Sequence, residues 1–136
     1  MNVKKLKKGF TLIELLAVIA MIGVLSTVVF TSYSKYITKS KISAAETELI
    51  QMVNEVENLF VINSSKNISP EDDLTPENIT SYDDLAVVGA FETYQYISNN
   101  ALTEDNIFTF SENVFHYQNH GVSVYYNVQT GEFVQG

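Results

Sequence analysis

The sequence has no cysteine, no tryptophan and no arginine, and it contains only two prolines and six glycines in 136 residues. Without cysteine there can be neither a disulfide nor a thiolate metal site, so the folded part must be stabilised by packing alone. All the basic residues are lysines, eight in number, against sixteen acidic residues, for a formal net charge of −8. A chain this acidic is not expected to bind nucleic acid directly.

Motifs of catalysis are also missing. The sequence contains no G-x-S-x-G, H-E-x-x-H or glycine-rich phosphate-binding pattern. His116 and His120 flank an expected turn and no cysteine joins them, so we expect no zinc site. The acidic run of residues 71–73 lacks the ligand spacing of a calcium loop, and we expect it to be a solvated loop. We therefore predict a protein that is not an enzyme and that needs no metal or cofactor.

One long apolar run lies near the N-terminus. From Phe10 to Phe30 every residue is apolar, small or hydroxylated except Glu14. As a helix, these 21 residues would extend about 31 Å, which matches a bilayer core of about 30 Å. A carboxylate inside such a segment is costly and usually has a partner. The lysines that precede the run are Lys4, Lys5, Lys7 and Lys8.

This N-terminal pattern has three interpretations. A secretory signal peptide has a shorter apolar region and a small-residue cleavage site after it, and neither condition is met here. A plain single-span anchor explains the length of the run and the flanking lysines, but it explains neither the Gly9-Phe10 dipeptide nor Glu14. The third interpretation is a prepilin-type leader, which explains all of these features.

Residues 7–16 resemble the processing and methylation signal of type IV pilins and of the related pseudopilins. Their sequence, KKGFTLIELL, combines a basic leader, a glycine, a phenylalanine and, as the fifth residue of the mature chain, a glutamate. The resemblance in sequence covers roughly the first 62 residues, and beyond them it concerns the architecture only. With the lack of arginine and cysteine, it favours a Gram-positive source.

The resemblance implies a role for each of these residues. A membrane-embedded prepilin peptidase would cut between Gly9 and Phe10 and would N-methylate Phe10. Glu14 would then neutralise the amino terminus of a neighbouring subunit during assembly, and this pairing would favour one axial stagger of the subunits. The leader lysines would hold the N-terminus on the cytoplasmic side.

We predict one helix from about residue 10 to about residue 62, with its first half in the membrane. No proline or glycine interrupts residues 24–69, and in a filament Gly23–Thr27 is the candidate stretch for local melting, although a continuous helix is equally plausible. Apolar residues in the second half recur every three or four positions, which indicates one apolar stripe. The stripe consists of Ile42, Ala45, Leu49, Met52, Val56 and Leu59, with Val53 and Phe60 beside it. A dimeric coiled coil is the alternative for this half, although the stripe covers only about two to three heptads.

A polar connection is expected after the helix. Capping residues precede proline at Ser69-Pro70 and Thr75-Pro76, which predicts two short helical turns. Residues 81–84 have the pattern of a capping box, and Gly89 has the position of a helix stop.

The C-terminal third is rich in β-branched and aromatic residues. We predict an antiparallel sheet of about three to five strands, with one face over the helix stripe and hairpin turns at residues 119–121 and 129–131. The candidate strands are residues 91–97, 107–110, 114–118, 122–128 and 132–134.

The expected fold is therefore α+β and pilin-like, with a long N-terminal helix packed on a small C-terminal antiparallel sheet. We expect a cleaved leader (1–9), a transmembrane and filament-core half-helix (10–33) and a head (34–136). The expected function is that of a structural subunit of a type IV pilus filament for adhesion, motility or biofilm formation. The alternatives are a pseudopilin of a type II-like secretion or DNA-uptake machine, and an uncleaved, anchored binding protein.

Several partners follow from this expectation. They are identical copies in a helical homopolymer, minor pilins, the prepilin peptidase, the assembly platform and, before assembly, membrane lipid. The chain would first be a single-pass protein of the cell membrane, and later part of an extracellular or wall-spanning filament.

Overall fold

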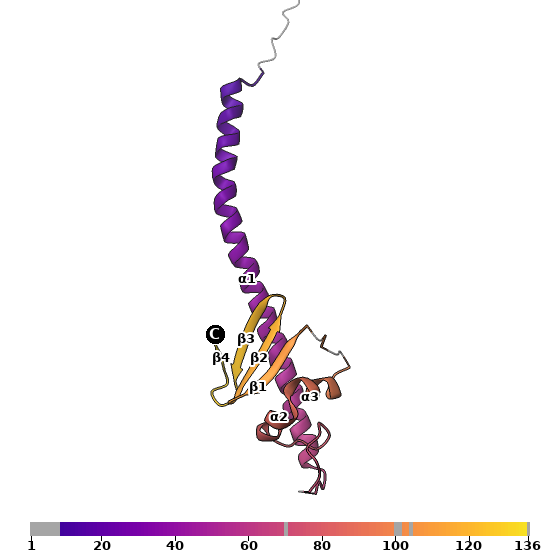
Figure 1. Ribbon diagram of the computed structural model, residues 1–136. Coiled ribbons are helices and arrows are strands. Elements are labelled where there is room, and N and C mark those ends of the chain that lie inside the picture. Colours follow the sequence, from indigo (N-terminus) through magenta and orange to yellow (C-terminus); the bar gives the residue numbers. More distant parts are fainter. Residues whose placement is uncertain (1–8, 70, 100–101, 104, 136) are drawn as a thin grey trace, which may run out of the picture. The chain divides into compact units, whose positions relative to one another are not determined.

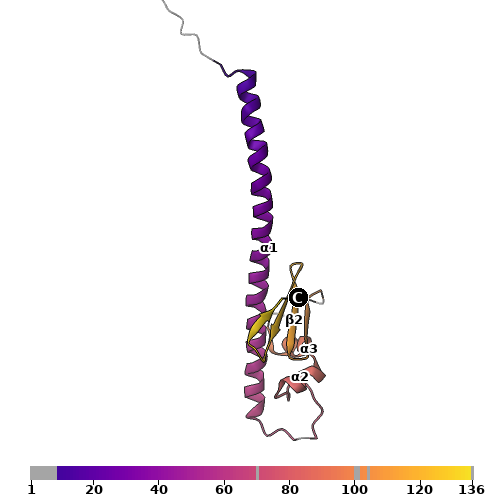
Figure 2. The same ribbon diagram turned by 90° about the vertical axis from the view of Figure 1, so that its left-hand side faces the viewer.

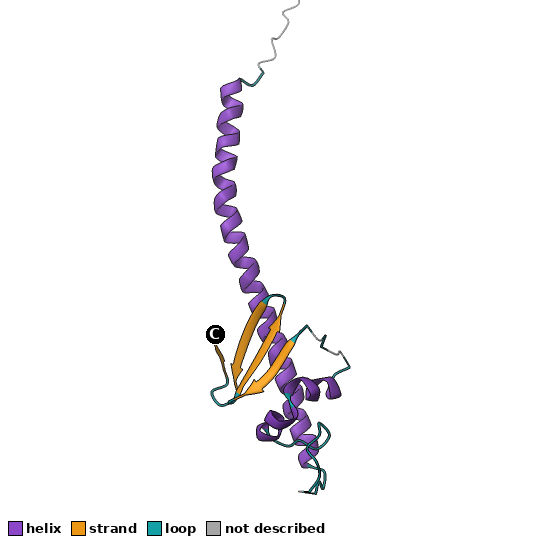
Figure 3. Ribbon diagram, in the orientation of Figure 1, coloured by secondary structure: helices purple, strands orange, loops and turns teal. Residues whose placement is uncertain are grey.

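The computed structural model describes residues 9–69, 71–99, 102–103 and 105–135. It contains three helices, α1 (Leu12–Ser64), α2 (Tyr82–Val88) and α3 (Ala90–Ile97), followed by four strands (Figures 1 and 3). The strands are β1 (Ile107–Ser111), β2 (Val114–Asn119), β3 (Val122–Asn127) and β4 (Glu132–Val134). The chain divides into two compact units, Met1–Ile37 and Thr38–Gly136. The predicted long helix and the α+β class are confirmed.

In the first unit, α1 has no buried side chain. All described residues up to Tyr36 are exposed. Hydroxyl groups bond within the helix itself, since Ser26 Oγ donates to the Ile22 carbonyl at 2.7 Å and Thr27 Oγ1 donates to the Val24 carbonyl at 2.8 Å. These two bonds satisfy the Ser26 and Thr27 hydroxyls within the helix, which suits an apolar environment. The helix is continuous through Gly23–Thr27, and melting of that stretch in a filament stays a prediction.

In the second unit, one apolar stripe of α1 is buried against the rest of that unit. The buried residues of α1 are Ala45, Leu49, Met52, Val53, Val56, Leu59, Phe60 and Asn63. The predicted stripe is therefore confirmed except at its first position, because Ile42 is 37% exposed. Because the stripe packs on the chain's own head, it offers no apolar seam for the alternative coiled coil.

The four strands form one antiparallel sheet in the order β1-β2-β3-β4. Figure 2 shows the sheet and α2 and α3 beside the second-unit part of α1. Successive side chains alternate between the two faces of a strand, and the buried face carries Phe108, Phe115, Tyr117 and Val124. Across the pairing, Phe115 lies opposite Phe110 on one side and Tyr126 on the other.

Aromatic rings fill the space between the sheet and the helices. The Phe108 and Phe115 rings stack with centroids 5.5 Å apart, and Tyr94 of α3 meets Phe108 edge-on at 5.7 Å. Such pairs add about 0.5–1.5 kcal/mol each beyond the area they bury. Because the sequence has no cysteine, packing of this kind stabilises the second unit without a disulfide.

The prediction of a strand at residues 91–97 is wrong, because this segment is the helix α3. Its aromatic and β-branched residues favour a strand locally, but its buried residues are Ala90, Thr93 and Tyr94. Their spacing of three and four places them on one helical face, whereas a strand would divide them between two faces. The hydroxyl of Thr93 also donates to the Gly89 carbonyl at 2.9 Å, which satisfies it inside the core.

The polar connection contains the predicted cap and turns. Ser81 is the N-cap of α2 and accepts from the Asp84 N–H, and Gly89 has a φ of 101° and donates its N–H to the Leu85 carbonyl. The Thr80 N–H donates to Asp84 at 2.9 Å and holds the pKa of that carboxyl below its ordinary value. At Thr75-Pro76 the chain makes a single turn closed by the Asn78 N–H, whereas Pro70 of the other predicted turn lies outside the described residues.

The two hairpin turns at the C-terminal end are confirmed. Gly121 and Gly131 have φ values of 76° and 71°, and His120 has a φ of 53°. This left-handed backbone is adopted readily by glycine, so both glycines are placed where the turns require them.

Two tyrosines fasten the head to α1 through glutamates on the polar sides of the stripe. Tyr117 donates its hydroxyl to Glu48 Oε2 at 2.7 Å, and Asn119 Nδ2 donates to the same oxygen at 3.2 Å. Tyr82 donates its hydroxyl to Glu57. Burial, and then the hydrogen bond to the glutamate, raises the pKa of both phenols well above the usual value of 10.

Alkaline pH is therefore expected to destabilise the head. Below pH 10 both phenols are protonated in the folded and unfolded states, and their contribution to stability is fully present. Above pH 10 the unfolded chain loses these protons while the folded chain keeps them, so the free energy of unfolding falls as pH rises. The urea midpoint of the detergent-solubilised chain, followed from pH 8 to pH 11, would measure this effect. In a Tyr82→Phe, Tyr117→Phe double variant the midpoint should fall less steeply with pH; an equally steep fall would contradict this assignment.

Candidate processing and assembly site

The expected cleavage residues precede the first turn of α1. Gly9 and Phe10 lie outside any helix or strand, and Phe10 is 93% exposed. A Cβ atom built on Gly9 would meet nothing within 4 Å. The fold of the chain therefore does not require glycine at this position. Lys4, Lys5, Lys7 and Lys8 lie outside the described residues.

Glu14 forms a capping box with Thr11 at the start of α1. The Thr11 N–H donates to Glu14 Oε2 at 3.1 Å, and the Glu14 N–H donates to Thr11 Oγ1 at 3.3 Å. This reciprocal pair satisfies two N–H groups at the helix end, which have no partners within the helix. The carboxylate also lies at the positive end of the helix dipole, where a negative charge is favourable.

The sequence interpretation assigned Glu14 to a neighbouring subunit and missed its bond to Thr11. The signal was nevertheless present, because Thr-x-x-Glu before an apolar run is the pattern of a capping box. One N–H occupies only part of the capacity of a carboxylate, which has about four acceptor sites. Glu14 is thus oriented in the single chain and can still accept from a further donor.

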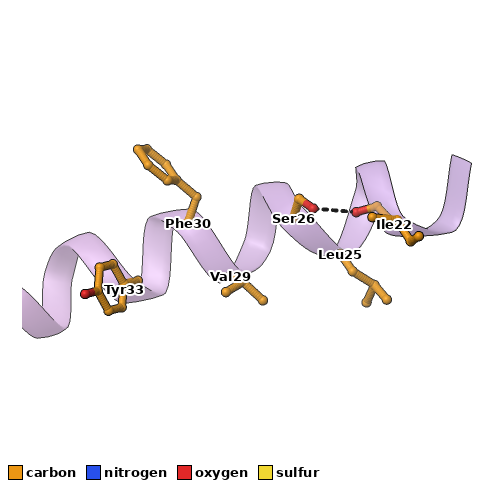
Figure 4. A pocket seen from close by; sticks show the side chains of 6 residues that line it. All are labelled: Ile22, Leu25, Ser26, Val29, Phe30 and Tyr33. Atoms are coloured by element: carbon orange, nitrogen blue, oxygen red, sulfur yellow. Dashed lines mark hydrogen bonds between the residues drawn. The ribbon is translucent and has the colours of Figure 1, made fainter. Parts of the chain in front are cut away.

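The surface that follows Glu14 is apolar all around the helix. Figure 4 shows part of it, a shallow groove lined by Ile22, Leu25, Ser26, Val29, Phe30 and Tyr33, in which Leu25 and Val29 point to the same side. Within the part of the chain that the structure describes, α1 is also the one helix long and apolar enough to cross a membrane. Exposure of this apolar surface to water is strongly unfavourable, so we expect lipid or other helices to surround it.

Comparison with known proteins places the match in this same region. Residues 4–30 match the family described as the prokaryotic N-terminal methylation motif. This range includes the leader lysines, Gly9, Phe10 and the Thr11–Glu14 capping box.

Several fimbrial proteins are similar to part of the chain. The type IV major fimbrial protein FimA of Dichelobacter nodosus is 44% identical over 54 residues, which are 40% of this chain and 35% of FimA. The type IV major alpha-pilin of Moraxella bovis is 37% identical over 73 residues, 54% of this chain and 46% of the pilin. The fimbrial protein EcpC of Eikenella corrodens is 48% identical over 42 residues, 31% of this chain and 28% of EcpC.

The similarity thus spans 28% to 46% of these relatives' own length. No solved structure matches the chain significantly. The methylation motif, the similarity to type IV fimbrial proteins and the α+β arrangement agree with one another. These findings support the type IV pilin family, on a sequence similarity that covers 31% to 54% of this chain.

Proposed function

We propose that this protein is a structural subunit of a type IV pilus filament. The observation that carries the proposal is the exposed apolar surface of the first half of α1. The single charged group of α1 before Lys35 is the Glu14 carboxylate, which is held at the helix N-terminus by Thr11. The role of the protein is structural, and adhesion, motility or biofilm formation would follow from the filament. The names of the similar proteins, which are fimbrial proteins and pilins, support this proposal.

Processing would come first. A prepilin peptidase would cut between Gly9 and Phe10 and methylate the new amino terminus, with the leader lysines on the cytoplasmic side. The exposed, non-helical Gly9-Phe10 bond supports this step, because a peptidase needs an extended substrate that it can reach. The mature chain would then stay in the membrane through α1 as a single span.

Assembly would follow by transfer of α1 from lipid to other copies of α1. Lipid chains are as apolar as the helix surface, so packing alone gives little preference for the filament. A charge pair supplies that preference, because an amine and a carboxylate attract strongly at low dielectric. We propose that Glu14, oriented by Thr11, accepts the methylated Phe10 amine of a neighbouring copy. The partners of this step would be identical copies, minor pilins and the assembly platform.

The mass of the N-terminal peptide in two fractions of native cells would test this function. In sheared surface material we expect a chain that starts at methylated Phe10, and that result would identify a filament subunit. The same terminus found only in membranes would favour a pseudopilin of a secretion or DNA-uptake machine. An intact Met1 in both fractions would contradict the proposal and leave an uncleaved, anchored protein.

A further inference from the structure

Positive and negative side chains are separated along the chain. Between Glu14 and Glu46 the only charged residues are Lys35, Lys39 and Lys41, all exposed on α1. Of the sixteen acidic residues, all except Glu14 lie at or beyond Glu46, where Lys66 is the only basic residue. Lys39 and Lys41 form no ion pair with another described residue. The second unit therefore begins with a short positive stretch and is otherwise strongly negative.

The densest negative stretch comprises the connection between α1 and α2 and the first turn of α2. Two of its carboxylates are used locally, since Asp72 accepts from the Ser69 N–H at 3.1 Å and Asp84 accepts from the Thr80 N–H at 2.9 Å. The other four are exposed and make no hydrogen bond to the residues described, so their charge is directed to solvent. We call these four residues the acidic loop: Glu71, Asp73, Glu77 and Asp83.

The two stretches of opposite charge lie at opposite ends of the second unit. Lys39 is near its start, and the acidic loop follows the end of α1 at Ser64. Along α1, residues 39 and 64 are about 38 Å apart at 1.5 Å per residue. Figures 1 and 2 both show the α1–α2 connection at the C-terminal end of α1. The Debye length at physiological salt is about 8 Å, so the two stretches cannot neutralise each other within one chain.

We propose that Lys39 and Lys41 of one subunit, which lie about 200° apart around α1, dock against the acidic loops of neighbouring copies of the chain. This inference rests on the proposed function, because it describes a contact between heads in the filament. A second copy is the favoured occupant because the same chain carries both complementary charges, exposed and unpaired. A surface that binds the opposite end of an identical molecule makes a heterologous contact, which generates an open fibre. The contact would also offset the repulsion between heads that are otherwise all negative.

Charge reversal in native cells tests this contact. We expect the Lys39→Glu, Lys41→Glu variant to give about tenfold less sheared filament than wild type, because juxtaposed like charges are strongly unfavourable at an interface. The Asp73→Lys, Glu77→Lys variant should show a similar loss. Combining the four substitutions restores opposite charges across the contact, and we expect the filament yield to recover.

A matched combination separates docking from net charge. In the matched combination, Lys39→Glu and Lys41→Glu are joined with Glu55→Lys and Glu132→Lys. Its net charge equals that of wild type, but the new lysines lie outside the acidic loop, at exposed positions of α1 and β4. We expect no recovery in this combination. Recovery in both combinations, or in neither, would overturn the proposed contact.

Two further results would also overturn it. In the first, the Lys39→Glu, Lys41→Glu variant gives a low filament yield in every combination, and its mature chain binds phosphatidylglycerol vesicles more weakly than the wild-type chain does. That result would show that the lysines bind anionic lipid. The other is unchanged filament yield in all variants. The failure of the proposed function is distinguishable from these results, because the wild-type chain itself would then be absent from the sheared material.

Discussion

Replacing Glu14 with alanine is expected to abolish filament assembly while leaving membrane insertion and leader cleavage intact. The substitution removes the only acidic group in the apolar half of α1, so the Phe10 amine of the neighbouring subunit would be buried without a counter-charge. Breaking a buried charge pair by removing one partner costs about 3–5 kcal/mol, which is on the order of a hundredfold or more in an equilibrium. Immunoblots of sheared filaments and of membranes, with the N-terminal mass of each fraction, would measure assembly and processing separately.

A second substitution at the same position separates the capping box from the charge. Glu14→Gln keeps a side-chain oxygen that can accept from the Thr11 N–H, at the 3.1 Å seen for Glu14 Oε2, but it carries no charge. If the charge pair drives assembly, the glutamine variant should assemble as poorly as the alanine variant. Filament yields near wild type for Glu14→Gln would show that the helix cap matters and would exclude the neutralising role.

Replacing Gly9 with glutamate should leave the leader attached on nearly all chains. A long, charged side chain beside the cleaved bond would prevent the extended backbone from entering the peptidase. The substitution would affect only the cleavage by the peptidase, because a Cβ atom at residue 9 would meet nothing within 4 Å in the folded chain. Mass spectrometry of the membrane fraction would then find a terminus at Met1 instead of Phe10, and no filament would form.

The folded head provides the control for this variant. Because a Cβ atom built on Gly9 would meet nothing within 4 Å, the urea midpoint of the Gly9→Glu variant should equal that of wild type. A normal Phe10 terminus in the variant would refute the cleavage site. A shifted urea midpoint would instead mean that the glycine has a role in folding.

Local sequence patterns were sufficient to predict the helices and strands whose residues follow one clear pattern. The helix α1 follows from the lack of breakers between residues 24 and 69 and from a stripe that recurs at 3.6 residues. The strands β1 to β4 follow from short β-branched and aromatic runs, separated by turns that need a left-handed residue at Gly121 and Gly131. At the N-terminus, the charge switch and the single carboxylate were enough to select Gly9, Phe10 and Glu14 as the residues to test.

Other features depend on contacts between residues that are distant in the sequence. Asn63, at the end of α1, is fully buried and its Nδ2 donates to the Ile79 carbonyl at 2.8 Å, which links the connection to α1. Glu48 and Glu57 lie beside the apolar stripe of α1, and each accepts a hydrogen bond from a tyrosine hydroxyl, of Tyr117 and Tyr82 respectively. No regular spacing of residues in the sequence predicts these contacts, because each depends on which segment packs against α1.

The sequence by itself thus determined the long helix and the four strands β1 to β4, because each is a short-range pattern of apolar spacing or turn residues, and it selected Gly9, Phe10 and Glu14 as the candidate residues of a processing signal. Only the tertiary structure decided that residues 91–97 are helical, since their strand propensity is weaker than the gain from placing Ala90, Thr93 and Tyr94 together in the core. It also decided that the positive and negative ends of the head lie apart, because the path of the α1–α2 connection places the acidic loop beyond Ser64. The physical reason is the same in both cases: burial and long-range charge depend on position in space, which a local pattern does not contain.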